Sequence, residues 1–141
     1  MLPSVTSDQL QILLDNVDNL RDRAIISLLF DSGLRVSEIC NINPQEVDFG
    51  SNTLRVIVKG NKEAKAAFTH GTAKLLMEYT SGNASEGILF NIKARGVQDM
   101  LARLSEKVGF PCNAHAFRRG FACNLLGFGV MGYLVYRWSI R

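Results

Sequence analysis

Apolar residues in the first third of the chain recur at intervals of three and four, the spacing that lines one face of an α-helix. Thr6 is followed three positions later by Gln9, a capping-box pattern that predicts a helix from there to about Val17. A second helix is expected over residues 20–32, because its apolar positions keep the same spacing and Gly33 offers a natural stop.

The pattern changes to that of a β-hairpin after a third, short helix that is expected to end near residues 43–44. Residues 53–58 are β-branched and apolar, residues 60–61 read Gly-Asn and favour a turn, and residues 64–69 can return as a second strand. This hairpin would place Lys59 at the turn-side end of its first strand.

Helical spacing resumes over residues 72–79, 95–108, 114–126 and 130–140, and the last of these segments is very apolar. Gly, Phe and Pro at residues 109–111 separate the second segment from the third. Helices, then a small antiparallel sheet, then helices again predict an α+β fold that is helix-dominant, with helices around a small antiparallel β-sheet. The length of 141 residues predicts that the whole chain is a single domain.

Composition narrows the class of protein. The longest uncharged apolar run is too short to span a bilayer and no leader-like segment opens the chain, which predicts a cytoplasmic protein without a membrane partner. Cys40, Cys112 and Cys123 are widely spaced, which favours reduced thiols over a disulfide framework. Cys112 and His115 have half the spacing of a zinc site, but no second pair of ligands follows. A packed thiol is therefore the favoured interpretation, and neither a metal nor a cofactor is expected.

Charge is divided unevenly along the chain, although the net value is only +3. Residues 1–50 hold three arginines and eight acidic residues, a net −5, whereas residues 51–141 hold thirteen basic and five acidic residues, a net +8. A basic half on a small domain is typical of a surface that binds nucleic acid. An ordinary solvated surface explains the same distribution equally well, so charge alone leaves both interpretations open.

Four side chains in three short motifs are candidates for phosphate chemistry. Arg35 stands in Gly-Leu-Arg-Val-Ser-Glu, Lys59 in Val-Lys-Gly-Asn-Lys-Glu, and His115 and Arg118 in His-Ala-Phe-Arg. Arginine presents a planar fork of donors that matches a phosphate, and lysine supplies a point charge or a proton. His115 and Arg118 are three residues apart on a predicted helix, so they share a face. Taken singly, each motif is explained as well by surface decoration, a satisfied core histidine or a common hairpin lysine.

Together, in this order, the motifs resemble the catalytic domain of tyrosine site-specific recombinases, the phage-type integrases. Residues 21–38, with Arg-Asp-x-Ala before Gly-Leu-Arg-Val-Ser-Glu, are similar to the segment that holds the family's first catalytic arginine. Lys59 follows that arginine on the predicted hairpin, where it matches the family's catalytic lysine. His115 and Arg118 match the His-x-x-Arg box. The resemblance extends from about residue 4 to residue 138.

The resemblance implies DNA recombination or integration, in which a tyrosine cuts and rejoins strands through a 3′-phosphotyrosine. The implied partners are double-stranded DNA and other recombinase subunits assembled on it, and no metal or high-energy cofactor is required. Arg35 and Arg118 would bind the non-bridging phosphate oxygens. Lys59 would donate a proton to the leaving 5′-oxygen, and His115 would assist acid–base work or orient the phosphate.

Two departures from the family pattern accompany the resemblance. The chain begins where the family's catalytic domain would begin, so the usual N-terminal core-binding domain is not expected in it. It ends soon after Arg118 without the Leu-Gly-His segment, and we interpret Tyr133 and Tyr136 as packing residues rather than the nucleophile. We therefore expect a catalytic-domain fragment that is inactive alone, unless a tyrosine is supplied in trans. The alternatives are a catalytically dead DNA-binding or protein-interaction module and, more weakly, a nuclease that uses water.

Overall fold

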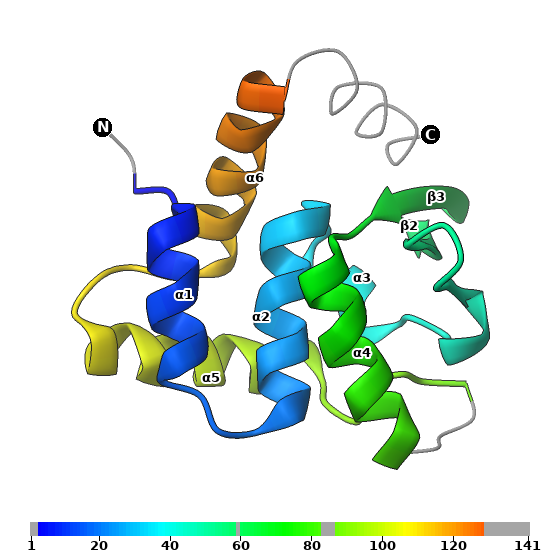
Figure 1. Cartoon of the computed structure of the whole chain (residues 1–141), viewed down its shortest axis with the longest axis horizontal. Coiled ribbons are helices and arrows are strands. Elements are labelled where there is room, and N and C mark those ends of the chain that lie inside the picture. Colours follow the sequence, from blue (N-terminus) through cyan, green and yellow to red (C-terminus); the bar gives the residue numbers. More distant parts are fainter. Residues whose placement is uncertain (1–2, 59, 83–86, 129–141) are drawn as a thin grey trace.

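The structure, a computed structural model, describes residues 3–58, 60–82 and 87–128. Within these ranges the chain forms six α-helices, one 3-10 turn and a three-stranded sheet (Figure 1). In chain order the elements are α1 (Ser7–Asp15), α2 (Leu20–Ser32), α3 (Val36–Cys40), the 3-10 turn (Pro44–Glu46), β1 (Val47–Asp48), β2 (Thr53–Val58), β3 (Lys62–Ala67), α4 (His70–Gly82), α5 (Ala94–Val108) and α6 (Ala114–Phe128). The predicted helix-dominant α+β fold is confirmed.

The start of α1 follows the local signal in the sequence. Thr6 Oγ1 accepts a hydrogen bond from the Gln9 N–H at 3.1 Å, and Gln9 Oε1 accepts one from the Thr6 N–H at 3.1 Å. The predicted capping box is therefore confirmed. The helix ends at Asp15, two residues earlier than expected, while α4 begins at His70, two residues before the predicted start.

The third helix is shorter than predicted because asparagines end it early. It stops at Cys40, where the Asn41 side chain donates to the Ser37 carbonyl at 2.9 Å and satisfies a carbonyl in its last turn. The Asn43 side chain then caps the 3-10 turn, because its Oδ1 accepts a hydrogen bond from the Gln45 N–H at 3.0 Å. The helix that the sequence predicts over residues 130–140 lies outside the described residues.

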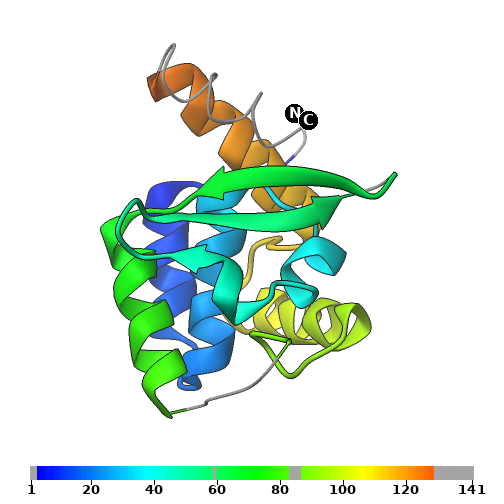
Figure 2. The ribbon, with the colours of Figure 1, turned by 90° about the vertical axis from the view of Figure 1, so that its right-hand side faces the viewer.

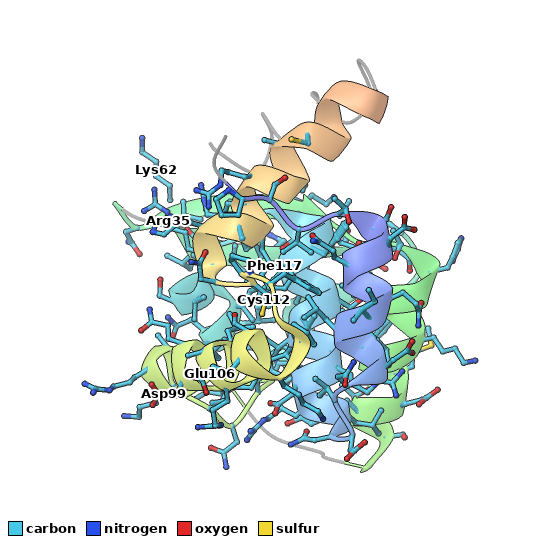
Figure 3. The ribbon with its side chains drawn as sticks, turned by 90° about the vertical axis from the view of Figure 1, so that its left-hand side faces the viewer. Arg35, Lys62, Asp99, Glu106, Cys112 and Phe117 are labelled. Atoms are coloured by element: carbon cyan, nitrogen blue, oxygen red, sulfur yellow. The ribbon has the colours of Figure 1, made fainter. Side chains whose placement is uncertain are left out.

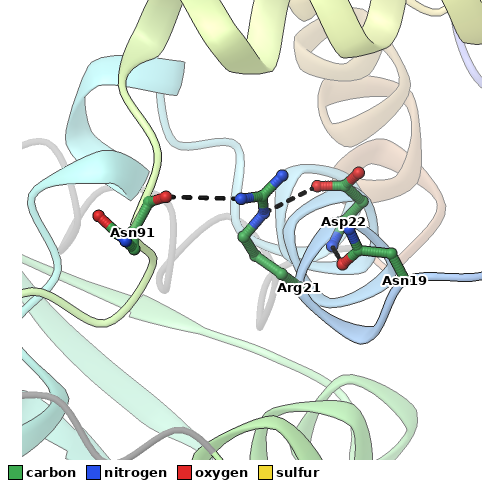
Figure 4. A network of polar contacts seen from close by, with 4 residues as sticks. All are labelled: Asn19, Arg21, Asp22 and Asn91. Atoms are coloured by element: carbon green, nitrogen blue, oxygen red, sulfur yellow. Dashed lines mark hydrogen bonds and ion pairs between the residues drawn. The ribbon is translucent and has the colours of Figure 1, made fainter.

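A polar network fixes the first turn of α2 (Figure 4). Asn19 Oδ1 accepts from the Asp22 N–H at 3.2 Å and caps the helix. Arg21 donates to the Asp22 carboxylate at 3.1 Å and to the Asn91 carbonyl at 3.4 Å. The network ties the start of α2 to the segment that leads into α5.

The core of the domain surrounds α2, which lies between α1 and α4 (Figure 1). Its seven residues 24–30 are all buried, so this helix contacts protein on every side. Phe90, before α5, and Phe117, on α6, are the largest fully buried side chains packed into the same core. No helix in the described ranges is long and apolar enough to cross a membrane.

A cluster of hydroxyl groups joins the end of α2 to the start of α4. Asp31 Oδ2 accepts from the Thr69 N–H at 2.8 Å, from the Thr69 hydroxyl at 2.8 Å and from the Thr72 hydroxyl. The Thr72 and Ser27 hydroxyls lie 2.6 Å apart beneath it. A carboxylate at a helix N-terminus is favourable, so this joint both caps α4 and holds it against α2.

The three strands pair in the order β1-β2-β3, all antiparallel (Figure 2). Leu54 and Val56 point inward from β2 and face two buried alanines of β3, while the residues between them are exposed. Gly60 (φ +83°) and Asn61 (φ +58°) form the turn in the left-handed conformation. The predicted hairpin is confirmed, with β3 starting and ending two residues early. Lys59 lies outside the described residues.

Candidate functional site

The backbone turns sharply between α2 and α3, and this corner carries Arg35. Gly33 ends α2 with φ +68°, a left-handed conformation that favours glycine. Leu34 is buried, 4% exposed, and anchors the corner in the core. Glu38 Oε1 accepts from the Arg35 N–H at 2.8 Å, so α3 starts at once. The backbone of Arg35 is therefore fixed while its side chain stays exposed to solvent.

The start of α6 carries His115 and Arg118. Asn113 caps the helix by accepting from the Ala116 N–H at 2.9 Å. Phe117, which is fully buried, anchors the same turn in the core. His115 is exposed and Arg118 is partly buried.

One hydrogen bond connects α6 to the corner. Arg118 Nη1 donates to the Gly33 carbonyl at 3.0 Å, across 85 residues of sequence. Its guanidinium group therefore contacts the backbone two residues before Arg35. The structure thus brings Arg118 to the corner that carries Arg35. His115 lies three residues earlier on α6 and is exposed, and no hydrogen bond or ion pair between described residues joins it to the corner.

Gly33 also makes a close packing contact that no pattern in the sequence indicates. A Cβ atom at Gly33 would lie 2.3 Å from Cδ2 of the Phe121 ring, far inside van der Waals contact. The ring is buried, at 9% exposure, and it sits one helical turn beyond Arg118. The absence of a side chain at Gly33 lets α6 approach the corner closely enough for the Arg118 hydrogen bond. Neither residue spacing nor charge could have identified Phe121.

The hairpin carries a further exposed cation. Lys62, the first residue of β3, is exposed, and Figure 3 shows it and Arg35 on the same side of the domain in that view. The expected site residue on this hairpin, Lys59, is outside the described residues, so its side chain is not placed against the arginines.

Arg55 forms ion pairs with carboxylates, whereas Arg35 and Arg118 form none among the described residues. On the sheet, Arg55 lies 2.5 Å from the Glu63 carboxylate and 3.9 Å from that of Glu46. The hydrogen bond and charge of Glu63, and then the charge of Glu46, raise the pKa of Arg55. Among the described residues, no carboxylate forms an ion pair with Arg35 or Arg118.

The Cys112 thiol belongs to the core. It is fully buried, its Sγ lies 3.1 Å from Ser105 Oγ, and burial is the main cause that raises its pKa. His115 is exposed three residues away. Within the described ranges, no group of three or more His, Cys, Asp or Glu side chains is arranged to hold a metal ion.

Comparisons with known proteins identify the family of the chain. Residues 3–132 match the model of the phage integrase family. The chain is similar to tyrosine recombinase XerA of Saccharolobus solfataricus, 34% identical over 123 residues, which cover 86% of this chain and 42% of that protein. Its identity with XerA of Pyrococcus horikoshii is 33% over 140 residues, covering 90% of this chain and 48% of that one.

Solved structures share the fold. The integrase from mycobacterium phage Brujita has a TM-score of 0.77 at 26% identity, and the match covers 97% of this chain and 50% of that one. The XerA recombinase structure has a TM-score of 0.82 at 23% identity, with 92% of this chain and 52% of that one covered. The chain thus spans about half the length of the relatives it matches. From its motifs, fold and near-complete family match, the chain belongs to the phage integrase family of tyrosine recombinases.

Proposed function

We propose that this chain binds the backbone phosphates of double-stranded DNA and forms the phosphate-binding part of a tyrosine recombinase catalytic centre. The observation that carries the proposal is the 3.0 Å hydrogen bond from Arg118 to the Gly33 carbonyl, beside Arg35. A guanidinium group held at the corner whose backbone carries Arg35, with no carboxylate paired to either arginine among the described residues, suits a phosphodiester anion.

The proposed chemistry assigns one task to each side chain. Arg35 and Arg118 bind the non-bridging oxygens and stabilise the charge that develops on them during phosphoryl transfer. Lys59, which lies between β2 and β3 in the sequence, donates a proton to the leaving 5′-oxygen, and His115 orients the phosphate or assists proton transfer. None of these steps requires a metal ion or a cofactor.

Two solved relatives support DNA as the partner. The Tn1549 transposon integrase is in complex with circular intermediate DNA, and the XerH recombinase is bound to its difH substrate. They are only 18% and 17% identical to this chain, so the similarity itself extends to the fold alone. The charge of the chain gives an independent reason, because residues 51–141 carry a net +8. Other recombinase subunits on the same DNA are the proposed protein partners.

Duplex binding tests the proposal. We expect weak binding with little sequence preference that falls steeply as salt rises, because phosphate contacts release counterions and carry no base information. Arg35→Ala and Arg118→Ala should each weaken binding by about 1–3 kcal/mol, the usual value for a hydrogen bond to a charged group. Fluorescence anisotropy with a labelled duplex at several salt concentrations measures both effects.

A matched control removes a cation elsewhere. Arg103 is exposed on α5, which lies below α6 in Figure 1, and Arg103→Ala deletes the same charge without touching the corner. If Arg103→Ala weakened binding as much as Arg118→Ala, the arginine corner would not be the phosphate site. Binding that ignored ionic strength would contradict the proposal as a whole.

We propose further that residues 1–141 do not cut DNA by themselves. Tyr79 is 6% exposed and packs against Phe90 with ring centroids 5.4 Å apart, so its hydroxyl is not presented to a phosphate at the corner. Tyr133 and Tyr136, the other two tyrosines of the chain, follow Arg118 in the sequence and lie outside the described residues. Positioned arginines accelerate phosphoryl transfer only when a nucleophile attacks.

A nicked suicide substrate tests for strand cleavage, since it traps any covalent protein–DNA adduct for detection on a denaturing gel. We expect no adduct with the chain alone. An adduct lost in Tyr133→Phe or Tyr136→Phe would show that one of these residues is the nucleophile. An adduct gained by adding the tyrosine-bearing segment of a relative would favour a recombinase fragment over the alternative, a DNA-binding or interaction module that never cut.

A further inference from the structure

The segment of residues 3–5 packs directly on α6 through two hydrogen bonds, a buried side chain and a close backbone approach. The Val5 N–H donates to the Ala116 carbonyl at 3.0 Å, and the Val5 side chain is 2% exposed. Arg119 donates through Nε to the Pro3 carbonyl. At Gly120, a Cβ atom would lie 2.3 Å from the Val5 carbonyl oxygen. The segment therefore contacts the helix backbone at a place where no side chain could fit.

These contacts and the arginine corner use different faces of the same helical turns. Successive residues of an α-helix are rotated by about 100°, so positions 116, 119 and 120 share one face. Arg118 and Phe121 point away from that face and meet Gly33, by a hydrogen bond of 3.0 Å and by the ring contact. The first turns of α6 are thus held between segment 3–5 and the end of α2.

The contacts of α6 with segment 3–5 and its contacts with Gly33 are coupled, because a packed helix moves as a rigid element. If segment 3–5 were displaced, α6 would lose a backbone hydrogen bond, the Arg119 contact and the buried Val5 side chain. The helix would then be free to shift or turn relative to Gly33. In the present position of α6, Arg118 reaches the Gly33 carbonyl at 3.0 Å.

We propose that Gly120 and Arg119 are positioning residues, through which the docking of segment 3–5 sets the position of Arg118 for phosphate binding. This inference rests on the proposed function, because it assumes that Arg118 binds a DNA phosphate. Neither residue need touch the phosphate itself. The close approach at Gly120 sets the distance between segment 3–5 and α6. The hydrogen bond from Arg119 sets the position of the segment along the axis of α6.

Gly120→Ala tests the proposal without changing any charge. Its Cβ must displace the Val5 carbonyl, so we expect the Kd for a labelled duplex to rise about three- to thirty-fold, which lies within the ordinary coupling between neighbouring residues. Gly71→Ala is the matched control, since that helical glycine has only an ordinary contact at 3.8 Å. Arg119→Lys, which keeps the charge and loses the Nε donor, should move the Kd in the same direction. Circular dichroism confirms folding at the temperature of each titration.

A double-mutant cycle separates positioning from a general loss of structure. In an Arg118→Ala background, Gly120→Ala should leave the Kd unchanged within about two-fold, because the residue through which it acts is already gone. An equal loss of affinity in both backgrounds, or no loss with Arg118 present, overturns the inference. If Arg118→Ala itself leaves binding unchanged, the proposed function fails first, and the two failures are told apart by that single variant.

Hydrogen exchange on the unsubstituted chain gives a second measurement, which decides the matter even if Gly120→Ala does not fold. Coupling between sites is reciprocal, so DNA held by Arg118 must strengthen the docking of segment 3–5. We expect the Val5 amide, which donates to Ala116, to exchange more slowly with saturating duplex. That added protection should be absent in Arg118→Ala. Protection that is absent in both proteins, or equal in both, overturns the inference.

Discussion

Replacing Gly33 by alanine tests whether the corner is built on a residue without a side chain. Two separate effects act on this substitution. The backbone has φ +68°, where an L side chain is strained, and the new Cβ would lie 2.3 Å from Cδ2 and 2.8 Å from Cγ of Phe121. The ring atoms nearest the clash include Cγ, at the rigid base of the side chain, so the ring cannot simply swing away.

The magnitude follows from comparison with Gly109, which ends α5 in the same way. Gly109 has φ +84° and no atom within 4 Å of the position that a Cβ would take, so Gly109→Ala meets only the backbone strain of about 1–2 kcal/mol. Gly33→Ala adds overpacking against Phe121, which in a packed core costs about 1–3 kcal/mol more. We therefore expect Gly33→Ala to lower the free energy of unfolding by about 2–5 kcal/mol.

Urea denaturation followed by circular dichroism measures both variants under the same conditions. A third protein, Phe121→Ala, and its combination with Gly33→Ala complete a cycle. Once the ring is gone, the effect of Gly33→Ala should fall to that of Gly109→Ala. Equal destabilisation by Gly33→Ala and Gly109→Ala in the unsubstituted background would refute the reasoning, since it would mean that the ring contact does not constrain α6.

Two further predictions concern stability and thiol chemistry. Asp31→Ala leaves the Thr69 N–H and hydroxyl, at the start of α4, without their acceptor, and it should lower the free energy of unfolding, measured in urea, by about 2–3 kcal/mol. Asp99 is exposed on α5, so Asp99→Ala should change the free energy of unfolding by less than about 0.5 kcal/mol. Iodoacetamide on the native protein at neutral pH, read by mass spectrometry, should modify Cys123 alone, because burial raises the pKa of the Cys40 and Cys112 thiols. Because burial penalises the thiolate form of Cys40 and Cys112 only in the folded protein, the unfolded thiols ionise first, and stability should fall as pH rises above about 8.5.

The parts of the fold that follow from the sequence are those with local causes. Thr6 and Gln9 cap α1 because their side chains reach backbone groups three residues away, and the pair is recognisable as a motif. Gly33 ends α2 because glycine tolerates positive φ. The β-branched and apolar residues 53–58 and the Gly-Asn turn predict the hairpin, because both are local signals in the sequence. Helix ends are predicted less accurately where side chains such as Asn41 compete for the last carbonyls.

Contacts between distant segments have no such signal. The joint between Asp31 and Thr69 spans 38 residues, and the bond between Arg118 and Gly33 spans 85. Each depends on how two elements pack, and neither leaves a pattern at fixed spacing. The motifs identify Arg35 and Arg118 as candidates for one site, but only the packing of α6 on α2 shows what brings Arg118 to the corner.

The structure also distinguishes the two arginines by how much freedom each has before an anion arrives. Arg118 is partly buried, and its bond to the Gly33 carbonyl holds the guanidinium group at the corner. A guanidinium group has five N–H donors, so a bond to one carbonyl leaves a fork for a phosphate. Arg35 has a fixed backbone but an exposed side chain, which must lose rotamer freedom on binding. In the proposed phosphate site Arg118 would therefore be the preorganised half, and this is why small displacements of α6, through Gly33 on one face or Gly120 on the other, are expected to matter more than changes around Arg35.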